Sequence, residues 1–155
     1  MAVGLMYLID PLGQLAKAND AKRKSDLEQL QRTLEVYYND NGKYPPSSAS
    51  YQINPASGEI NWGDSWSAYN TKLPADPSSS RKYVYYSPST GASAYQSYYL
   101  YASLERTADP QLCSPLDSYG ECPSIGTNPI LATHCGPDPF TKPCNYGVSS
   151  PNVSP

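Results

Sequence analysis

Hydrophobic positions in the first third of the chain recur at helical spacing. Leu27, Leu30, Leu34 and Tyr37 follow one another at steps of three or four residues, so they fall on one stripe of a helix. The charged residues that we assign to the opposite face, or beside it, are Asp26, Glu28, Arg32 and Glu35. Gly42 then supplies a left-handed cap, with a proline soon after it. The pattern predicts a helix over residues 12–39 that needs an apolar partner along one side.

The segment before this helix is more apolar than the helix itself. Residues 1–9 are almost wholly apolar, yet a bilayer span needs about 20 such residues. A signal peptide would show a basic start and a small-residue cleavage site, and neither is visible. We therefore expect residues 1–9 to be the rear half of a longer hydrophobic helix that begins upstream of Met1. Its surroundings would be a membrane or neighbouring helices.

Pro11 marks the boundary between the apolar segment and the more polar helix. Because proline lacks an amide hydrogen and clashes with the preceding turn, it either kinks a continuous helix or opens a new one capped by Asp10. In either case the two halves need not be collinear.

Strand patterns follow the helix. Residues 82–87 and 96–104 are rich in Tyr, Val and Leu and are separated by turn-forming residues, so we predict two antiparallel strands, with a third at residues 145–149. A short hairpin is expected between residues 51–54 and 59–62. Because so small a sheet is marginal alone, it should pack its apolar face on the helix stripe. The predicted fold class is α+β, within one domain of 155 residues.

The amino-acid composition favours some classes of function and argues against others. The chain holds 15 Tyr against 1 Phe and 2 Trp, which favours surfaces that are partly apolar and partly hydrogen-bonding, suited to subunit packing or adhesion. The net charge of −3 is small, and basic residues gather at Lys22, Arg23 and Lys24 without forming a continuous basic face. This balance argues against a nucleic-acid partner.

The four cysteines all follow residue 112. Cys113 and Cys122, like Cys135 and Cys144, are nine residues apart in a segment rich in proline and glycine, which favours two disulfides and an oxidising compartment. Stability does not decide which cysteines pair. Each sequential disulfide would stabilise the folded chain by roughly 2–3 kcal/mol, and crossed disulfides would add only slightly more. We favour the sequential pairing, since each short loop then holds its own turn residues. The alternative is a zinc site with His134, although its ligand spacing fits zinc poorly.

Catalytic motifs are missing from the sequence. His134 is the only histidine, and no nucleophile elbow, phosphate-binding glycine loop or zinc-protease motif occurs, so we expect no enzyme and no cofactor. Trp62, Trp66 and Tyr69 could stack on a sugar ring, but covering the helix is the more common role for such residues.

Several runs resemble bacterial type IV pilins and type II secretion pseudopilins. On the helix they are QLAKA at 14–18, KRKSDL at 22–27 and YYNDNGKYP at 37–45, and beyond it LPADP at 73–77, YVYY at 83–86 and YYLYASLE at 98–105. The resemblance that these runs carry extends over about the first two thirds of the chain. The family's processing motif and its filament-registering glutamate are absent, so the chain as printed is not a substrate for a prepilin peptidase.

The resemblance implies an extracellular filament subunit. It implies a helix of residues 1–44 in the filament and a head of residues 45–155, with the subunit anchored in the bacterial membrane before assembly. The expected partners are other copies of the chain, joined in an open helical polymer, and a pilus or secretion assembly machinery. The expected core contacts are Leu5, Met6, Leu8, Ile9, Leu12 and Leu15.

The sequence leaves two alternative functions open. Within the family, the chain could be a secretion pseudopilin, and some of these hold calcium in a C-terminal loop, for which Asp117, Glu121 and Asp138 are weak candidates. From another class, it could be a membrane-anchored adhesin or carbohydrate-binding module with an unknown surface ligand. The sequence does not distinguish motility, adhesion, DNA uptake and secretion.

Overall fold

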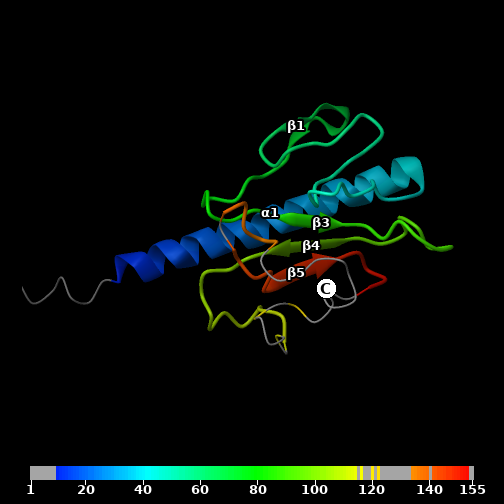
Figure 1. The fold of residues 1–155 in the computed structure, drawn as a ribbon. Coiled ribbons are helices and arrows are strands. Elements are labelled where there is room, and N and C mark those ends of the chain that lie inside the picture. Colours follow the sequence, from blue (N-terminus) through cyan, green and yellow to red (C-terminus); the bar gives the residue numbers. More distant parts are fainter. Residues whose placement is uncertain are drawn as a thin grey trace, which may run out of the picture.

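The computed structural model describes residues 10–114, 116, 120, 122, 134–139 and 141–153. A single long helix, α1 (Pro11–Asn41), crosses the molecule, and most of the head lies beside its C-terminal two thirds (Figure 1). Asp10 caps the start of α1, because its side chain accepts a hydrogen bond of 3.0 Å from the amide of Gly13. Pro11 takes the first helical position, where a missing amide hydrogen costs nothing.

The end of α1 follows the predicted chemistry. Gly42 has a φ of 68°, in the left-handed region, and its amide donates to the carbonyl of Tyr38 at 2.7 Å. The helix is two residues longer at this end than residues 12–39 because Asp40 and Asn41 continue it to the glycine.

A three-stranded antiparallel sheet lies along α1 in the order β3-β4-β5. Its strands are β3 (Val84–Tyr86), β4 (Tyr99–Ala102) and β5 (Tyr146–Ser149). All three fall within the segments predicted as strands, so this part of the prediction is confirmed, with shorter elements. The register places Leu100 of the central strand opposite both Tyr85 and Val148.

The predicted hairpin is present only in a minimal form. Between residues 51–54 and 59–62 the structure forms only a bridge from Ile53 to Ile60. A small two-stranded sheet forms instead a few residues later, from β1 (Ser65–Trp66) and β2 (Thr71–Lys72) around the short 3₁₀ helix η2 (Ser67–Tyr69). Asn70 closes this turn at a φ of 51°, a conformation that asparagine tolerates better than most residues.

The three-stranded sheet is buried on both faces. Alternate side chains point to α1, among them Tyr85, Leu100 and Tyr146, and join the helix stripe in the larger core cluster. The helix residues of that cluster are Leu27, Leu30, Leu34 and Tyr37. The sheet therefore packs on the helix stripe as predicted.

On its other face the sheet meets the cysteine segment. Val84 and Tyr101 are fully buried there against Cys122, Cys135 and Cys144. The described cysteines thus form a third layer, with α1 and the sheet as the other two.

Two charged residues of α1 are buried, although both were expected on the polar side of the helix. Asp26 was assigned to the face opposite the stripe, but only 7% of it is exposed, and Arg23, part of the predicted basic cluster, is fully enclosed. Asp26 tolerates burial because Lys22 and the hydroxyl of Tyr83 both donate to its Oδ2 at 2.6 Å. The stripe therefore continues toward the start of α1 through charged residues that have partners.

Candidate functional site

Three large apolar side chains of α1 are exposed. Leu12 is 77% exposed, Leu15 58% and Val36 49%, although core leucines of the same helix are completely covered. Leu12 and Leu15 are two of the predicted filament contacts, and the structure leaves both open near the start of α1, away from the sheet. The other four, Leu5, Met6, Leu8 and Ile9, lie outside the described residues.

Shallow grooves flank the exposed Val36. The smaller one, about 170 Å³, is lined by Arg32, Thr33, Val36 and Tyr69. The larger, about 480 Å³, is lined by Gln31, Arg32, Glu35, Val36, Tyr98, Ser149 and Pro151. Arg32 and Val36 therefore stand between two depressions. Over the described range, no helix has the length and apolar character that a membrane crossing requires.

Arg23 joins α1 to the head. Its Nε and Nη2 donate to the two carboxylate oxygens of Asp76 at 2.7 and 2.9 Å, and its Nη1 reaches Asp20 at 2.8 Å and Glu105 at 2.9 Å. Burial alone would lower the pKa of Arg23, but the carboxylates outweigh it, Asp76 most, and hold that pKa above its ordinary value. The guanidinium is therefore a permanent positive charge with a carboxylate from each of three chain segments.

Asp20 extends this connection to the backbone. Its two oxygens accept the amides of Glu105 at 2.8 Å and Arg106 at 3.0 Å, just after β4. Lys24 adds a further contact at 2.7 Å to Asp109, which also accepts the amide of Gln111. The hydrogen bond from Lys24 lowers the pKa of Asp109, with burial acting against it. These contacts fix the angle between the N-terminal half of α1 and the head.

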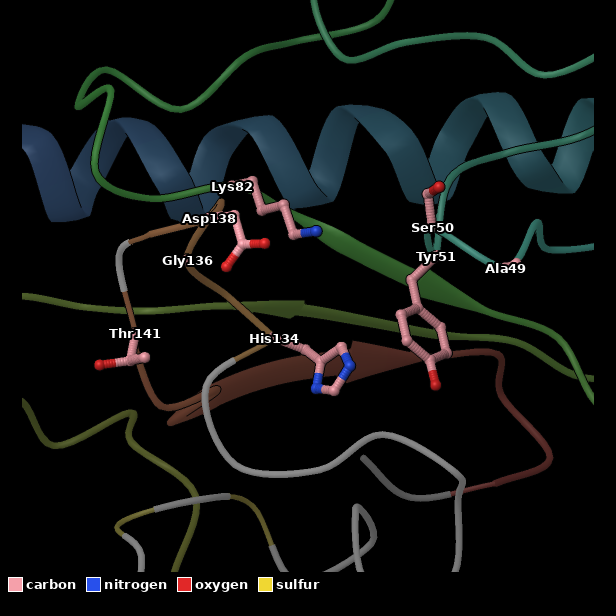
Figure 2. Close-up of a pocket in the computed structure, with 8 residues that line it drawn as sticks. All are labelled: Ala49, Ser50, Tyr51, Lys82, His134, Gly136, Asp138 and Thr141. Carbon is pink, nitrogen blue, oxygen red and sulfur yellow. The ribbon is translucent and has the colours of Figure 1, made fainter.

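The cysteines pair in sequence order. Cys113 bonds to Cys122 and Cys135 to Cys144, and no free cysteine is found among the described residues. This is the favoured pairing, and it leaves no thiolate in these residues for the zinc alternative with His134. Of the calcium candidates, Asp117 and Glu121 lie outside the described residues, while Asp138 borders a surface pocket beside Lys82 and His134 (Figure 2). The described part of the chain contains no cluster of three potential metal ligands.

The aromatic residues considered for sugar stacking pack on the core instead. Trp66 is 2% exposed, with its ring 5.5 Å from Tyr37 on α1 and 4.9 Å from Tyr69. Trp62 meets Tyr83 edge to face at 5.8 Å. These rings cover α1 as a loop layer, the more common role expected for them.

Sequence reasoning missed the ionic connection around Arg23. A signal was present: Asp20 and Arg23 continue the spacing of Leu27 and Leu30 toward the N-terminus, so they lie on the buried side. The partners Asp76 and Glu105 are 53 and 82 residues away from Arg23 along the chain. Nothing local identifies them.

A comparison with family models gives one match. The model described as type II secretion system (T2SS), protein G, matches residues 11–103, which runs from the start of α1 through β4 and includes Arg23 and Asp76. The matched range ends before the first cysteine. Searches of curated proteins and of solved structures found no match.

Proposed function

Because the chain belongs to the type II secretion system protein G family, whose members are structural pseudopilin subunits, we propose that it polymerises through its N-terminal helix into a filament. Residues 1–44 would run along the filament axis and residues 45–155 would form the outer head. The observation that carries this proposal is the pair of exposed leucines, Leu12 and Leu15, on a helix firmly joined to the head.

A free subunit exposes Leu12 and Leu15 to water. Each leucine side chain left in water forgoes about 25 cal/mol per Å² of apolar burial. Contact between copies related by a rotation that does not close removes that cost and produces an open helical fibre. The partners are then other copies of the chain and the assembly machinery in the membrane.

The compartment follows from the cysteines. Two disulfides persist outside the cytoplasm, where thiols are not kept reduced. We place the filament there, with the subunit held at the membrane before assembly.

Two filament types remain as specific candidates. The family match favours a short secretion filament. The disulfide-linked third layer, which lies beyond the matched residues, favours the pilus-like filament as the second candidate, since it adds a covalent brace suited to a surface fibre. Deleting the gene separates them: loss of protein secretion supports the first, and loss of surface fibres with normal secretion supports the second.

Polymerisation itself is tested by replacing Leu12 and Leu15 with serine in the subunit as the cell makes it. We expect filaments in negative stain to be lost, with the melting temperature of the head unchanged, because both side chains are exposed in the single chain. Leu116→Ser, at a position 37% exposed on the head, is the matched control. Filaments of normal number and length from the double variant would contradict the proposal.

A further inference from the structure

A polar surface pocket lies on the head, away from the exposed leucines. It has a volume of about 350 Å³ and opens between the turn at Ser50 and Tyr51 and the segment around Cys135 (Figure 2). Four of the side chains that line it are Tyr51, Lys82, His134 and Asp138. This volume is at the lower end of the range typical of small-molecule sites.

An aromatic wall forms one side of the pocket. The rings of Tyr51 and His134 meet edge to face, with centroids 5.0 Å apart and an angle of 88°. Tyr51 has a φ of 58°, a left-handed conformation that a bulky residue adopts only when its surroundings enforce it. Its amide donates to the carbonyl of Ser48 at 3.1 Å, and its carbonyl accepts the amide of Tyr85 at 2.9 Å. The backbone therefore holds this ring at the pocket despite an unfavourable conformation.

Two opposite charges border the same space. Lys82 is placed by its own amide, which donates to the carbonyl of Cys135 at 2.9 Å, and Asp138 lies in the loop closed by the Cys135–Cys144 disulfide. Among the described residues, neither side chain has an ion-pair partner within 4.0 Å. In Figure 2 both side chains extend to the same side, toward the region bordered by Tyr51 and His134. The pocket therefore offers an ammonium donor and a carboxylate acceptor, each available to a ligand.

The charges exclude several ligand classes. Asp138 disfavours an anion such as phosphate, and Lys82 disfavours a divalent cation, because a like charge would stand in the same small space. The polar lining offers little to a lipid. A neutral ligand with many hydroxyl groups fits both charges, since each hydroxyl donates to a carboxylate and accepts from an ammonium. Its C–H face would pack on the ring of Tyr51.

We propose that this pocket binds a neutral carbohydrate of one or two sugar rings. The site is distinct from Trp62, Trp66 and Tyr69, which pack in or against the core, and it does not depend on filament formation. A filament of such heads would present the pocket once per subunit, so weak binding at each site would add up.

The test uses the full chain with its disulfides intact and an array of immobilised neutral mono- and disaccharides. We expect binding to at least one saccharide, and titration of the wild-type protein with it should shift the NMR signals of Tyr51 and His134. Lys82→Gln and Asp138→Asn should each weaken that binding about tenfold or more, because each removes a charged hydrogen-bonding partner. Tyr51→Asn, which tolerates the left-handed backbone, should weaken it as well.

The control is Lys72→Gln, which removes an exposed lysine on β2 and should bind normally. Inorganic phosphate and calcium are titrated in parallel as ion probes. The proposal is overturned if no neutral saccharide binds, if signal shifts fall elsewhere on the head, if the three pocket variants bind like wild type, or if only an ion binds.

Discussion

Arg23 and Asp76 form a two-point ion pair between the middle of α1 and the loop that leads to β3. The side chains are 0% and 1% exposed, and the paired N–O distances are 2.7 and 2.9 Å. Such a pair is costly to break from one side, because the remaining charge stays buried. The relative orientation of the two side chains is also restricted, because a planar guanidinium and a carboxylate form two parallel hydrogen bonds. The pair thus fixes the position of this loop on α1.

Asp76→Asn should lower the free energy of unfolding by about 3 kcal/mol, near the lower end for a broken buried pair because Asp20 and Glu105 still face the guanidinium. Urea denaturation measures the change. Arg32→Met, on the exposed face of α1, is the control and should stay within about 0.5 kcal/mol. In a double-mutant cycle, Arg23→Met with Asp76→Leu should cost less than the sum of the single changes, and strict additivity would contradict the coupling.

The local part of this architecture was predictable and the long-range part was not. The spacing of Leu27, Leu30 and Leu34 and the glycine at position 42 are short-range signals, and the structure has the helix, its buried stripe and its cap where they indicate. The burial of Arg23 depends on Asp76, which a local pattern does not reveal. A triplet of basic residues suggests a solvated surface until its carboxylate partners are known.

The same difference between local and long-range features applies to the two candidate surfaces. Apolar residues at a helix start are visible locally, so the sequence alone suggests Leu12 and Leu15 as filament contacts, which stays a prediction. The sequence did not predict the pocket at Tyr51 and Lys82, because residues from separate loops form this pocket only in the folded chain. Its most unusual feature, the left-handed backbone of Tyr51, has no signature in a residue type that normally avoids it.

Leu30→Ala tests the packing of α1 on the sheet. Leu30 is 1% exposed within the main core cluster, so its truncation should lower the free energy of unfolding by about 2–4 kcal/mol through lost burial and a residual cavity. Urea melts followed by circular dichroism measure it. Val36→Ala, which truncates a half-exposed side chain of the same helix, should change stability far less. Coincident melts of Leu30→Ala and wild type would be incompatible with this core.

Removing the Cys135–Cys144 disulfide tests the third layer. The double change to alanine should lower the free energy of unfolding by about 2–3 kcal/mol, because a short covalent loop no longer restricts the unfolded chain. The far-ultraviolet circular dichroism signal of α1 should remain. The helix packs on one face of the sheet, and the disulfide lies on the other face. A non-reducing peptide map of the wild-type protein should show both sequential bridges and no free thiol. A crossed pairing, or stoichiometric zinc in the purified protein, would contradict the assignment.

Asp109 gives the connection between α1 and the head a defined pH dependence. The hydrogen bond from Lys24 holds the pKa of Asp109 below its ordinary value in the folded chain, so the carboxylate binds its proton more weakly folded than unfolded. Its contribution to stability is therefore fully present above about pH 4, the ordinary pKa of an aspartate, and is lost as the pH falls through the lower folded value. Asp109→Asn should destabilise the protein at pH 7, and the difference from wild type should shrink steadily below pH 4. Urea melts of both proteins between pH 2 and pH 7 measure this, and Asp40→Asn, at an exposed position near the end of α1, is the control. A difference that stays constant over the whole range would mean that the carboxylate charge of Asp109 does not stabilise the folded chain.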